Sequence, residues 1–267
     1  MKLIEEVKLL TEADPSPSKR IEFVGLEFDA LGIDDVRARL GAATPASEFR
    51  YLVTPNVDHL VRLADQDSAG SELWEAYRNA SLCVCDSRIV SALARMRGIY
   101  LPVANGSDVT AALFASGVKP GDTIAIVGST PVAVAKLSAA YRDVKFVHHE
   151  PVMGLLHDPQ AMVAAADFIR EAKARFTFIA VGSPQQELVA LLTRKRGGAV
   201  GYGLCIGAAI DFLVGMQKRA PRLVQRLSLE WAHRLLSDPK RLWRRYLLTG
   251  PRIFLIVGRW RRRSLGD

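Results

Sequence analysis

The segment Asp122–Tyr141, DTIAIVGSTPVAVAKLSAAY, is the clearest indicator of the fold. Its first part, Asp122–Val127, is an apolar run that stops at Gly128-Ser129, and helical periodicity follows over Pro131–Tyr141. A short continuous apolar run is typical of a strand buried on both faces, as in a parallel sheet. We therefore expect a strand, a tight turn and a helix in this order.

The same alternation extends in both directions from this segment. It predicts an α/β, Rossmann-like fold, with a mostly parallel sheet covered by helices on both faces. Strands are expected at Ile21–Phe28, Tyr51–Thr54, Ala80–Cys85, Val144–His148, Thr177–Val181 and Ala199–Ile206, and helices at Asp34–Leu40, Asp58–Leu63, Ile89–Arg97, Ser107–Ser116, Gln160–Ala174 and Gln185–Lys195.

The composition is that of a folded protein with an uneven charge. The chain has 267 residues, of which 49% are hydrophobic and 24% charged, and its net charge is +8. Residues 216–267 contain fourteen Lys or Arg and three acids, or +11, whereas residues 1–215 contain 22 basic and 25 acidic residues, or −3. We therefore predict an N-terminal extension at 1–20, a Rossmann-like body at 21–215 and a basic, amphipathic α-helical appendage at 216–267. Such asymmetry indicates an anionic partner.

Apolar residues in the appendage recur at helical spacing and form a stripe, namely Leu227, Trp231, Leu235, Leu242, Trp243, Tyr246 and Leu247. Trp, Tyr and Leu beside Arg suit an anionic membrane surface. The alternative is that the stripe packs on the body and the charges are merely solvated. Nucleic acid is disfavoured because no recognised nucleic-acid motif is present. With neither a signal peptide nor a spanning segment, we expect a cytoplasmic protein, peripheral on the inner face of the cell membrane.

The three cysteines, Cys83, Cys85 and Cys205, are odd in number and predict buried, reduced thiols rather than disulfides. Cys83 and Cys85 would share one face of a strand. His148 and His149 would point to opposite faces, without a third ligand, so no metal site is expected.

Small and polar residues follow the predicted strands, where ligands bind in such sheets. These groups are Thr54-Pro55-Asn56, Asp86-Ser87, Gly128-Ser129, Gly182-Ser183-Pro184 and Gly207–Asp211. Two of them have simpler explanations, because Gly128-Ser129 could be only a tight turn before a helix and Asp86 could only cap one. After Gly128, the second and third glycines of a dinucleotide fingerprint are missing, and no Walker lysine follows.

The order of several motifs resembles the WecG/TagA/CpsF glycosyltransferases from about Ile21 to about Trp260. The matching pieces are Thr54-Pro55-Asn56, Asp86, Gly106-Ser107-Asp108, Val181–Glu187, Gly207–Phe212, Gly215, Arg219-Ala220-Pro221, Leu229-Glu230-Trp231 and Asp238–Tyr246. The resemblance implies an inverting enzyme that needs no metal or other cofactor. It would move glucose, N-acetylmannosamine or its uronic acid from a UDP-sugar to a polyprenyl-diphosphate-linked sugar, in cell-surface or exopolysaccharide synthesis.

The resemblance also assigns roles by position. Asp86 would be the catalytic base, with Thr54 and Asn56 near the reacting sugar. Gln186 and Asp211 would contact the donor. Apart from the resemblance, the position of Gly128, Ser129 and Ser183 at predicted strand ends also makes them candidate donor-binding residues. Three appendage arginines, Arg234, Arg241 and Arg244, would reach the diphosphate. Self-association is also compatible with the resemblance.

Two departures concern the sugar more than the reaction. Ser87 follows Asp86 where the family usually has Gly, and Val103-Ala104-Asn105 stands where an Arg is usual, a place that Arg88 could fill. The rival hypotheses are a non-catalytic, membrane-tethered nucleotide-binding module and a nicotinamide-dependent oxidoreductase. The incomplete glycine fingerprint argues against the second.

Overall fold

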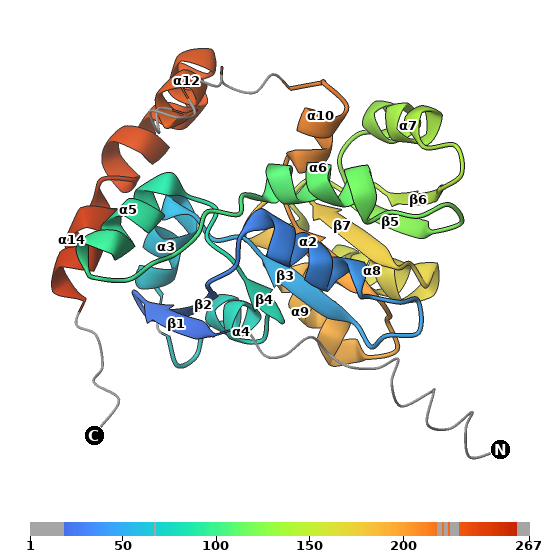
Figure 1. Cartoon of the computed structure of the whole chain (residues 1–267), viewed down its shortest axis with the longest axis horizontal. Helices are drawn as coiled ribbons and strands as arrows, with labels where there is room; N and C mark the ends of the chain where they lie inside the picture. Colours follow the sequence, from blue (N-terminus) through green and yellow to red (C-terminus); the bar gives the residue numbers. More distant parts are fainter. Residues whose placement is uncertain (1–18, 67, 218–220, 222–223, 225–229, 261–267) are drawn as a thin grey trace.

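The computed structural model describes residues 19–66, 68–217, 221, 224 and 230–260. Its centre is a six-stranded sheet of order β4-β3-β8-β7-β5-β6, in which every neighbouring pair is parallel (Figure 1). The strands are β3 (Arg50–Val53), β4 (Leu82–Cys83), β5 (Thr123–Gly128), β6 (Lys145–His149), β7 (Phe176–Ala180) and β8 (Tyr202–Cys205). The predicted parallel α/β sheet is therefore confirmed.

Helices cover both faces of the sheet and enclose two hydrophobic cores. Because successive strand side chains point to opposite faces, Tyr51 and Val53 enter one core and Leu52 the other. The core with Leu52 receives side chains from α2 (Ile33–Gly41), α6 (Gly106–Ser116), α7 (Pro131–Ala140) and α10 (Ala209–Leu213). The other receives them from α3 (Val57–Ala64), α4 (Glu72–Arg78), α5 (Arg88–Met96), α8 (Pro159–Ala172) and α9 (Gln185–Arg196). A short 3-10 helix, η1 (Leu155–His157), precedes α8.

The prediction of a single strand at Ile21–Phe28 is wrong. Instead of one strand at Ile21–Phe28, the chain makes an antiparallel hairpin of β1 (Arg20–Phe23) and β2 (Leu26–Asp29), separate from the main sheet. Val24 and Gly25, at φ 48° and 83°, form the turn between them. Gly25 accommodates this conformation without strain, so its presence within an apolar run is the signal of the turn.

The cysteine predictions hold in the described structure. Cys83 and Cys85 lie in the same core, Cys205 is also buried, and all three are free thiols.

The appendage lies along one flank of the molecule, beside α3 and α5 (Figure 1). Its described elements are α12 (Glu230–Ser237), α13 (Pro239–Trp243), the π-helical segment η2 (Arg244–Thr249) and α14 (Arg252–Arg259). The predicted helical appendage is present, although Leu227 lies outside the described residues. Among the helices that the structure describes, none is long and apolar enough to cross a bilayer.

The last helix attaches the appendage to the body. Ile253 and Val257 of α14 are 1% and 5% exposed and belong to the same core as α3. Arg252 forms an ion pair with Asp65 at the end of α3, and Arg97 donates a hydrogen bond to the Gly258 carbonyl at 3.1 Å. The appendage is therefore packed on the body through a buried apolar face with polar contacts at its edge.

Candidate active site

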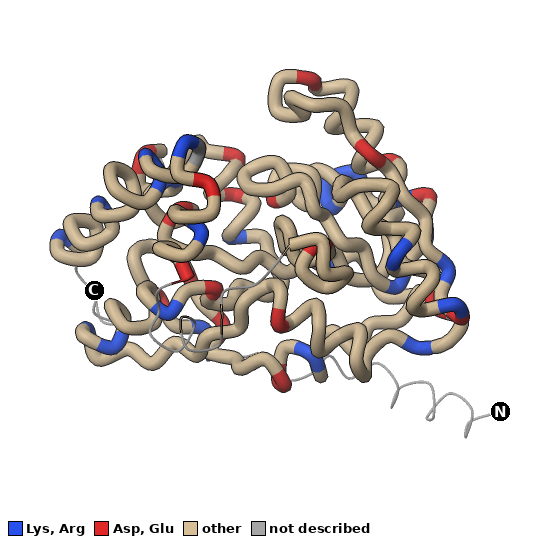
Figure 2. Tube along the Cα trace, turned by 90° about the horizontal axis from the view of Figure 1, so that it is seen from above, with Lys and Arg blue, Asp and Glu red and all other residues tan. Residues whose placement is uncertain are grey.

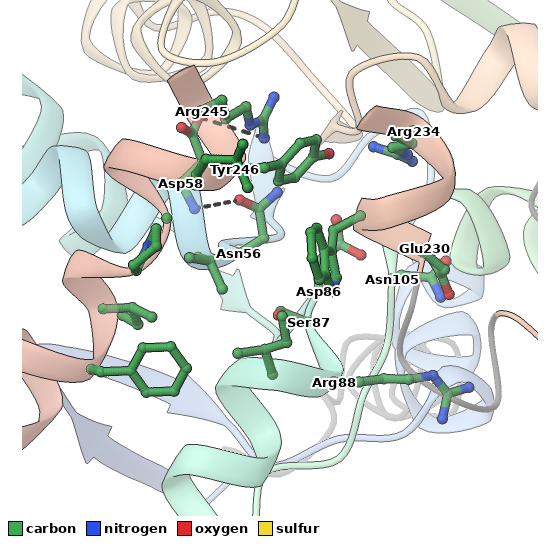
Figure 3. A pocket seen from close by; sticks show the side chains of 18 of the residues that line it. Asn56, Asp58, Asp86, Ser87, Arg88, Asn105, Glu230, Arg234, Arg245 and Tyr246 are labelled. Carbon is green, nitrogen blue, oxygen red and sulfur yellow. Dashed lines mark hydrogen bonds and ion pairs between the residues drawn. The ribbon is translucent and has the colours of Figure 1, made fainter. Parts of the chain in front are cut away.

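A cavity of about 450 Å³ lies between the body and the appendage, at the carboxyl ends of β3 and β4 (Figure 3). The body contributes residues that follow these strands and begin α3, α5 and α6, and the appendage contributes α12, η2 and α14. Its polar lining residues are Asn56, Asp58, Asp86, Ser87, Arg88, Asn105, Glu230, Arg234 and Arg245, and its apolar ones include Val57, Ile89, Val103, Trp231, Tyr246, Leu247, Ile253 and Phe254.

Three helices begin at the cavity, each with a side-chain cap that lines it. Asn56 accepts hydrogen bonds from the backbone of Asp58 and His59, Ser87 from Val90 at 3.2 Å, and Asn105 from Asp108 at 2.9 Å. Capping satisfies the first free N–H groups of each helix and fixes its start. The positive ends of three helix dipoles therefore meet at one cavity, which favours a bound anion.

Asp86 is not a helix cap, although its position allowed that interpretation. Ser87 caps α5 instead, and the backbone N–H of Asp86 donates to the Pro55 carbonyl at 3.0 Å, which ties the ends of β3 and β4 together. The carboxylate therefore remains in the cavity wall, half-buried and at the centre of Figure 3.

Burial raises the pKa of Asp86 to about 8. Arg234 opposes this rise by favouring the ionised carboxylate, whereas the negative charges of Glu230 and Asp108 add to it. A hydrogen bond from the Gly106 backbone also favours the ionised form. A carboxylate with such a pKa can accept a proton near neutral pH, which an ordinary aspartate does poorly.

Helix α12 places one acidic and one basic side chain near the Asp86 carboxylate. Glu230 and Arg234 are four residues apart, so they share one face of the helix, and both line the cavity. The Arg234 guanidinium also lies over the Phe212 ring, 5.6 Å from its centroid. Arg234 therefore stands between the Asp86 cavity and helix α10.

A second appendage arginine, Arg245, lines the opposite part of the cavity; it belongs to the matched motif Asp238–Tyr246 but is not among the predicted site residues. Its Nη2 lies 3.5 Å from Asp58 Oδ2, which also accepts from Arg62 Nη2 at 2.9 Å. The sequence carries only a weak signal for it, since Arg244 and Arg245 are adjacent and the pitch of η2 decides which one faces inward.

Two predicted site residues are buried in the body rather than in the cavity wall. Thr54 is 3% exposed and donates to the Cys205 carbonyl at 3.3 Å. Gln186 is 2% exposed, and its amide accepts from the Gly207 N–H at 2.9 Å and donates to Glu187 at 2.8 Å. The Thr54 bond therefore joins the ends of β3 and β8, and the Gln186 bond to Gly207 joins the start of α9 to the end of β8.

The bonds of Gln186 belong to a buried polar network below the cavity. Tyr77 donates to Glu187 at 3.2 Å and lies 3.0 Å from His59 Nδ1. Burial raises the pKa of Glu187 and lowers that of His59 to about 3. With this lowered pKa, His59 is neutral at physiological pH. The network links α3, α4 and α9.

The predicted donor residues Gly128, Ser129 and Asp211 form a separate cluster, outside the cavity lining. Ser129 Oγ donates to Asp211 Oδ1 at 3.1 Å, which joins the end of β5 to α10. Gly128 has a positive φ of 84°, and a Cβ there would lie 2.7 Å from Val181. Close packing alone therefore requires this glycine. Ser183 lies outside the cavity lining, accepts from Arg62 at 3.0 Å and is hydrogen-bonded to Tyr77 and Glu187 of the buried network.

Of the other two predicted arginines, Arg244 does not line the cavity. Arg244 is exposed, with its guanidinium over Trp243. For Arg241 only the backbone, in α13, is described. As expected, His148 and His149 diverge. His148 lies 2.9 Å from the Gly128 carbonyl, and His149 stacks on Phe168.

The glycosyl transferase WecG/TagA/CpsF family model matches residues 21–266, nearly the whole chain. The chain belongs to this family. It is therefore a glycosyltransferase, an enzyme that acts on a sugar donor and an acceptor. In this glycosyltransferase, Asn56 and Asp86 from the matched motifs lie at one cavity with Arg234, whereas Thr54 and Gln186 lie in the protein beneath.

Proposed function

We propose that this glycosyltransferase moves a sugar from a UDP-sugar to a polyprenyl-diphosphate-linked acceptor, with inversion and without a metal. The acceptor hydroxyl oxygen would attack the anomeric carbon as the bond from that carbon to the UDP oxygen breaks. The hydroxyl proton passes to Asp86, and the bonding electrons leave with UDP. The observation that carries this proposal is the Asp86 carboxylate, which lies in the cavity wall, does not cap α5 and has a pKa raised to about 8. Such a base contributes roughly 10²–10⁴-fold in rate.

The donor is best accommodated between Arg234 and the Ser129–Asp211 pair. Arg234 contacts Phe212, the neighbour of Asp211, and lies on the Asp86 side of α10. A diphosphate there would have the guanidinium beside it, and an arginine fork binds phosphate oxygens in pairs. Charge developing on the leaving UDP would be stabilised most where water is excluded. The uracil would then extend toward Asp211.

The surface of the appendage supports the proposal that the enzyme lies at the inner face of the cell membrane. Several large apolar side chains on it are more than half exposed, among them Leu236, Leu247, Leu248, Phe254 and Leu255. They accompany the basic residues of this segment, and Figure 2 shows Lys and Arg along the appendage near the C-terminus. Apolar and cationic groups together favour an anionic bilayer surface. An acceptor anchored in lipid would meet the cavity there.

The test is a donor screen with the full chain. UDP-glucose, UDP-N-acetylmannosamine and its uronic acid are each offered with a polyprenyl-diphosphate-linked sugar, and UDP release is measured. We expect one donor to give acceptor-dependent release. The Asp86→Asn variant should lose transfer by about 10²-fold or more while binding UDP like the wild type. Substantial turnover by this variant would assign the base to another group.

A further inference from the structure

Resting on the proposed function, we propose that Arg245 binds the diphosphate of the acceptor, with the first prenyl carbons on Leu247 and Phe254. The cavity would then hold two diphosphates at different places. The donor lies toward Arg234 and α10, and the acceptor toward Arg245 and α3. The ligand chemistry is a prenyl diphosphate, an anion joined directly to a hydrocarbon chain.

The charges around Arg245 leave a positive excess. Asp58 accepts from Arg62 at 2.9 Å and lies 3.5 Å from Arg245, so two guanidinium groups share one carboxylate. Arg62 has a second acceptor in Ser183, which fixes it on the body side. Of the two guanidinium groups, that of Arg245 is therefore the more weakly paired, and 37% of its side chain is exposed.

One donor of this arginine is also unpaired. Arg245 Nε is buried and has no hydrogen-bond partner among the described residues. Buried polar groups nearly always have a partner, so the described protein does not satisfy the hydrogen-bonding capacity of this guanidinium. The backbone agrees, because Arg245 lies in a π-helical segment, closed by a hydrogen bond from Gly250 N–H to the Arg245 carbonyl at 2.7 Å. Such segments are frequent at functional sites.

An apolar path leads from Arg245 to the outside. Leu247 and Phe254 line the cavity, yet they are 54% and 60% exposed, so they reach from its interior to its mouth. Leu248 and Leu255, 58% and 62% exposed, are their neighbours along the chain. A free inorganic or nucleotide phosphate would not use such a surface, whereas a prenyl chain would bury it.

The position of Arg245 favours the acceptor over the donor. Figure 3 shows Arg245 with Asp58 on one side of Tyr246, and Arg234 with Glu230 on the other. Of these two arginines, Arg234 is the one whose guanidinium lies over Phe212 of α10, the helix that also contains Asp211, the partner of Ser129. A nucleotide that reaches Asp211 therefore brings its diphosphate to Arg234, and a second anion is needed to pair Arg245.

Calorimetric titration of the full chain tests this assignment. The probes are farnesyl diphosphate, inorganic pyrophosphate and UDP. We expect Arg245→Gln to weaken farnesyl diphosphate binding by about tenfold or more and to leave UDP binding unchanged within about twofold. The matched control is Arg259→Gln, which removes the same charge from an exposed position on α14 outside the cavity. It should bind all three probes like the wild type. Phe254→Ser should weaken farnesyl diphosphate but not pyrophosphate.

Three results would overturn the proposal. They are failure of the wild type to bind farnesyl diphosphate, unchanged binding by Arg245→Gln, and a loss of UDP affinity in that variant as large as the loss for farnesyl diphosphate. The last result would assign Arg245 to the donor. These binding results are independent of turnover. If no UDP-sugar supports transfer while farnesyl diphosphate binding still depends on Arg245, the proposed transfer reaction fails and the prenyl-diphosphate site stands.

Discussion

At the scale of single residues, the environment of Asp86 predicts the pH dependence of the reaction. A base must be ionised to accept a proton, and burial raises the pKa of Asp86 to about 8. We therefore expect kcat/KM to rise with pH, by about tenfold per unit below a midpoint near 8. Glu230→Gln removes a negative charge that raises this pKa, so its midpoint should lie at lower pH. Initial rates from pH 5.5 to 9.5 would give the midpoint for the wild type and for Glu230→Gln. A higher midpoint in Glu230→Gln than in the wild type would contradict this account.

The same residue should reduce the stability of the fold. Because the pKa of Asp86 is higher in the folded than in the unfolded chain, the folded state binds the proton more tightly. The contribution of Asp86 to stability is therefore greatest below about pH 4 and falls as the pH rises toward 8. Asp86→Asn cannot ionise, so at pH 8.5 it should be more stable than the wild type by roughly 2 kcal/mol, or about 4–8 °C in Tm. Thermal unfolding at pH 8.5 and pH 4 checks this, since the difference should vanish in acid.

At the scale of elements, α14 decides whether the cavity has its second wall. Ile253 is 1% exposed, so Ile253→Ala should cost about 2–4 kcal/mol in the packing of the appendage. We expect faster tryptic cleavage at the appendage arginines and a lower rate of transfer. Leu255→Ala, on the same helix but 62% exposed, is the matched control for packing and should be cleaved at the wild-type rate. Equal cleavage rates in the two variants would mean that α14 does not hold the appendage.

The elements that the sequence predicts well are those whose pattern is local. Asp122–Tyr141 forms β5 and α7 nearly as expected, because a buried apolar run and a helical period each determine their element. The prediction at Ala80–Cys85 is too long, since β4 pairs only through Leu82 and Cys83. The hairpin at Arg20–Asp29 is predicted as one strand because both of its strands, β1 and β2, lie in the same apolar run. Strand order is set by contacts distant in sequence and cannot be read from local periodicity.

At the scale of the whole molecule, the predicted site divides along the tertiary structure. Asn56, Asp86 and Arg234 meet at one cavity, although they come from three distant parts of the chain. Motif resemblance selected them, but it could not separate residues that line the cavity from those that support it, such as Thr54 and Gln186. Nor could it choose between Arg244 and Arg245, because the choice depends on the helical pitch and on Asp58. Which side chains reach the cavity is therefore a tertiary property.

The uneven charge leads to a prediction about membrane binding by the intact protein. Each cation near an anionic bilayer contributes about 1 kcal/mol, and salt reduces this because the screening length falls from about 10 Å at 0.1 M to about 3 Å at 1 M. We expect the protein to sediment with vesicles that contain anionic phospholipid, and less at 1 M salt. The double variant Leu248→Ser/Leu255→Ser should bind more weakly at both salt concentrations, because apolar insertion is not screened. Met153→Ser, on a fully exposed body residue, is the control. Equal binding to neutral vesicles would show that charge does not direct the protein to the membrane.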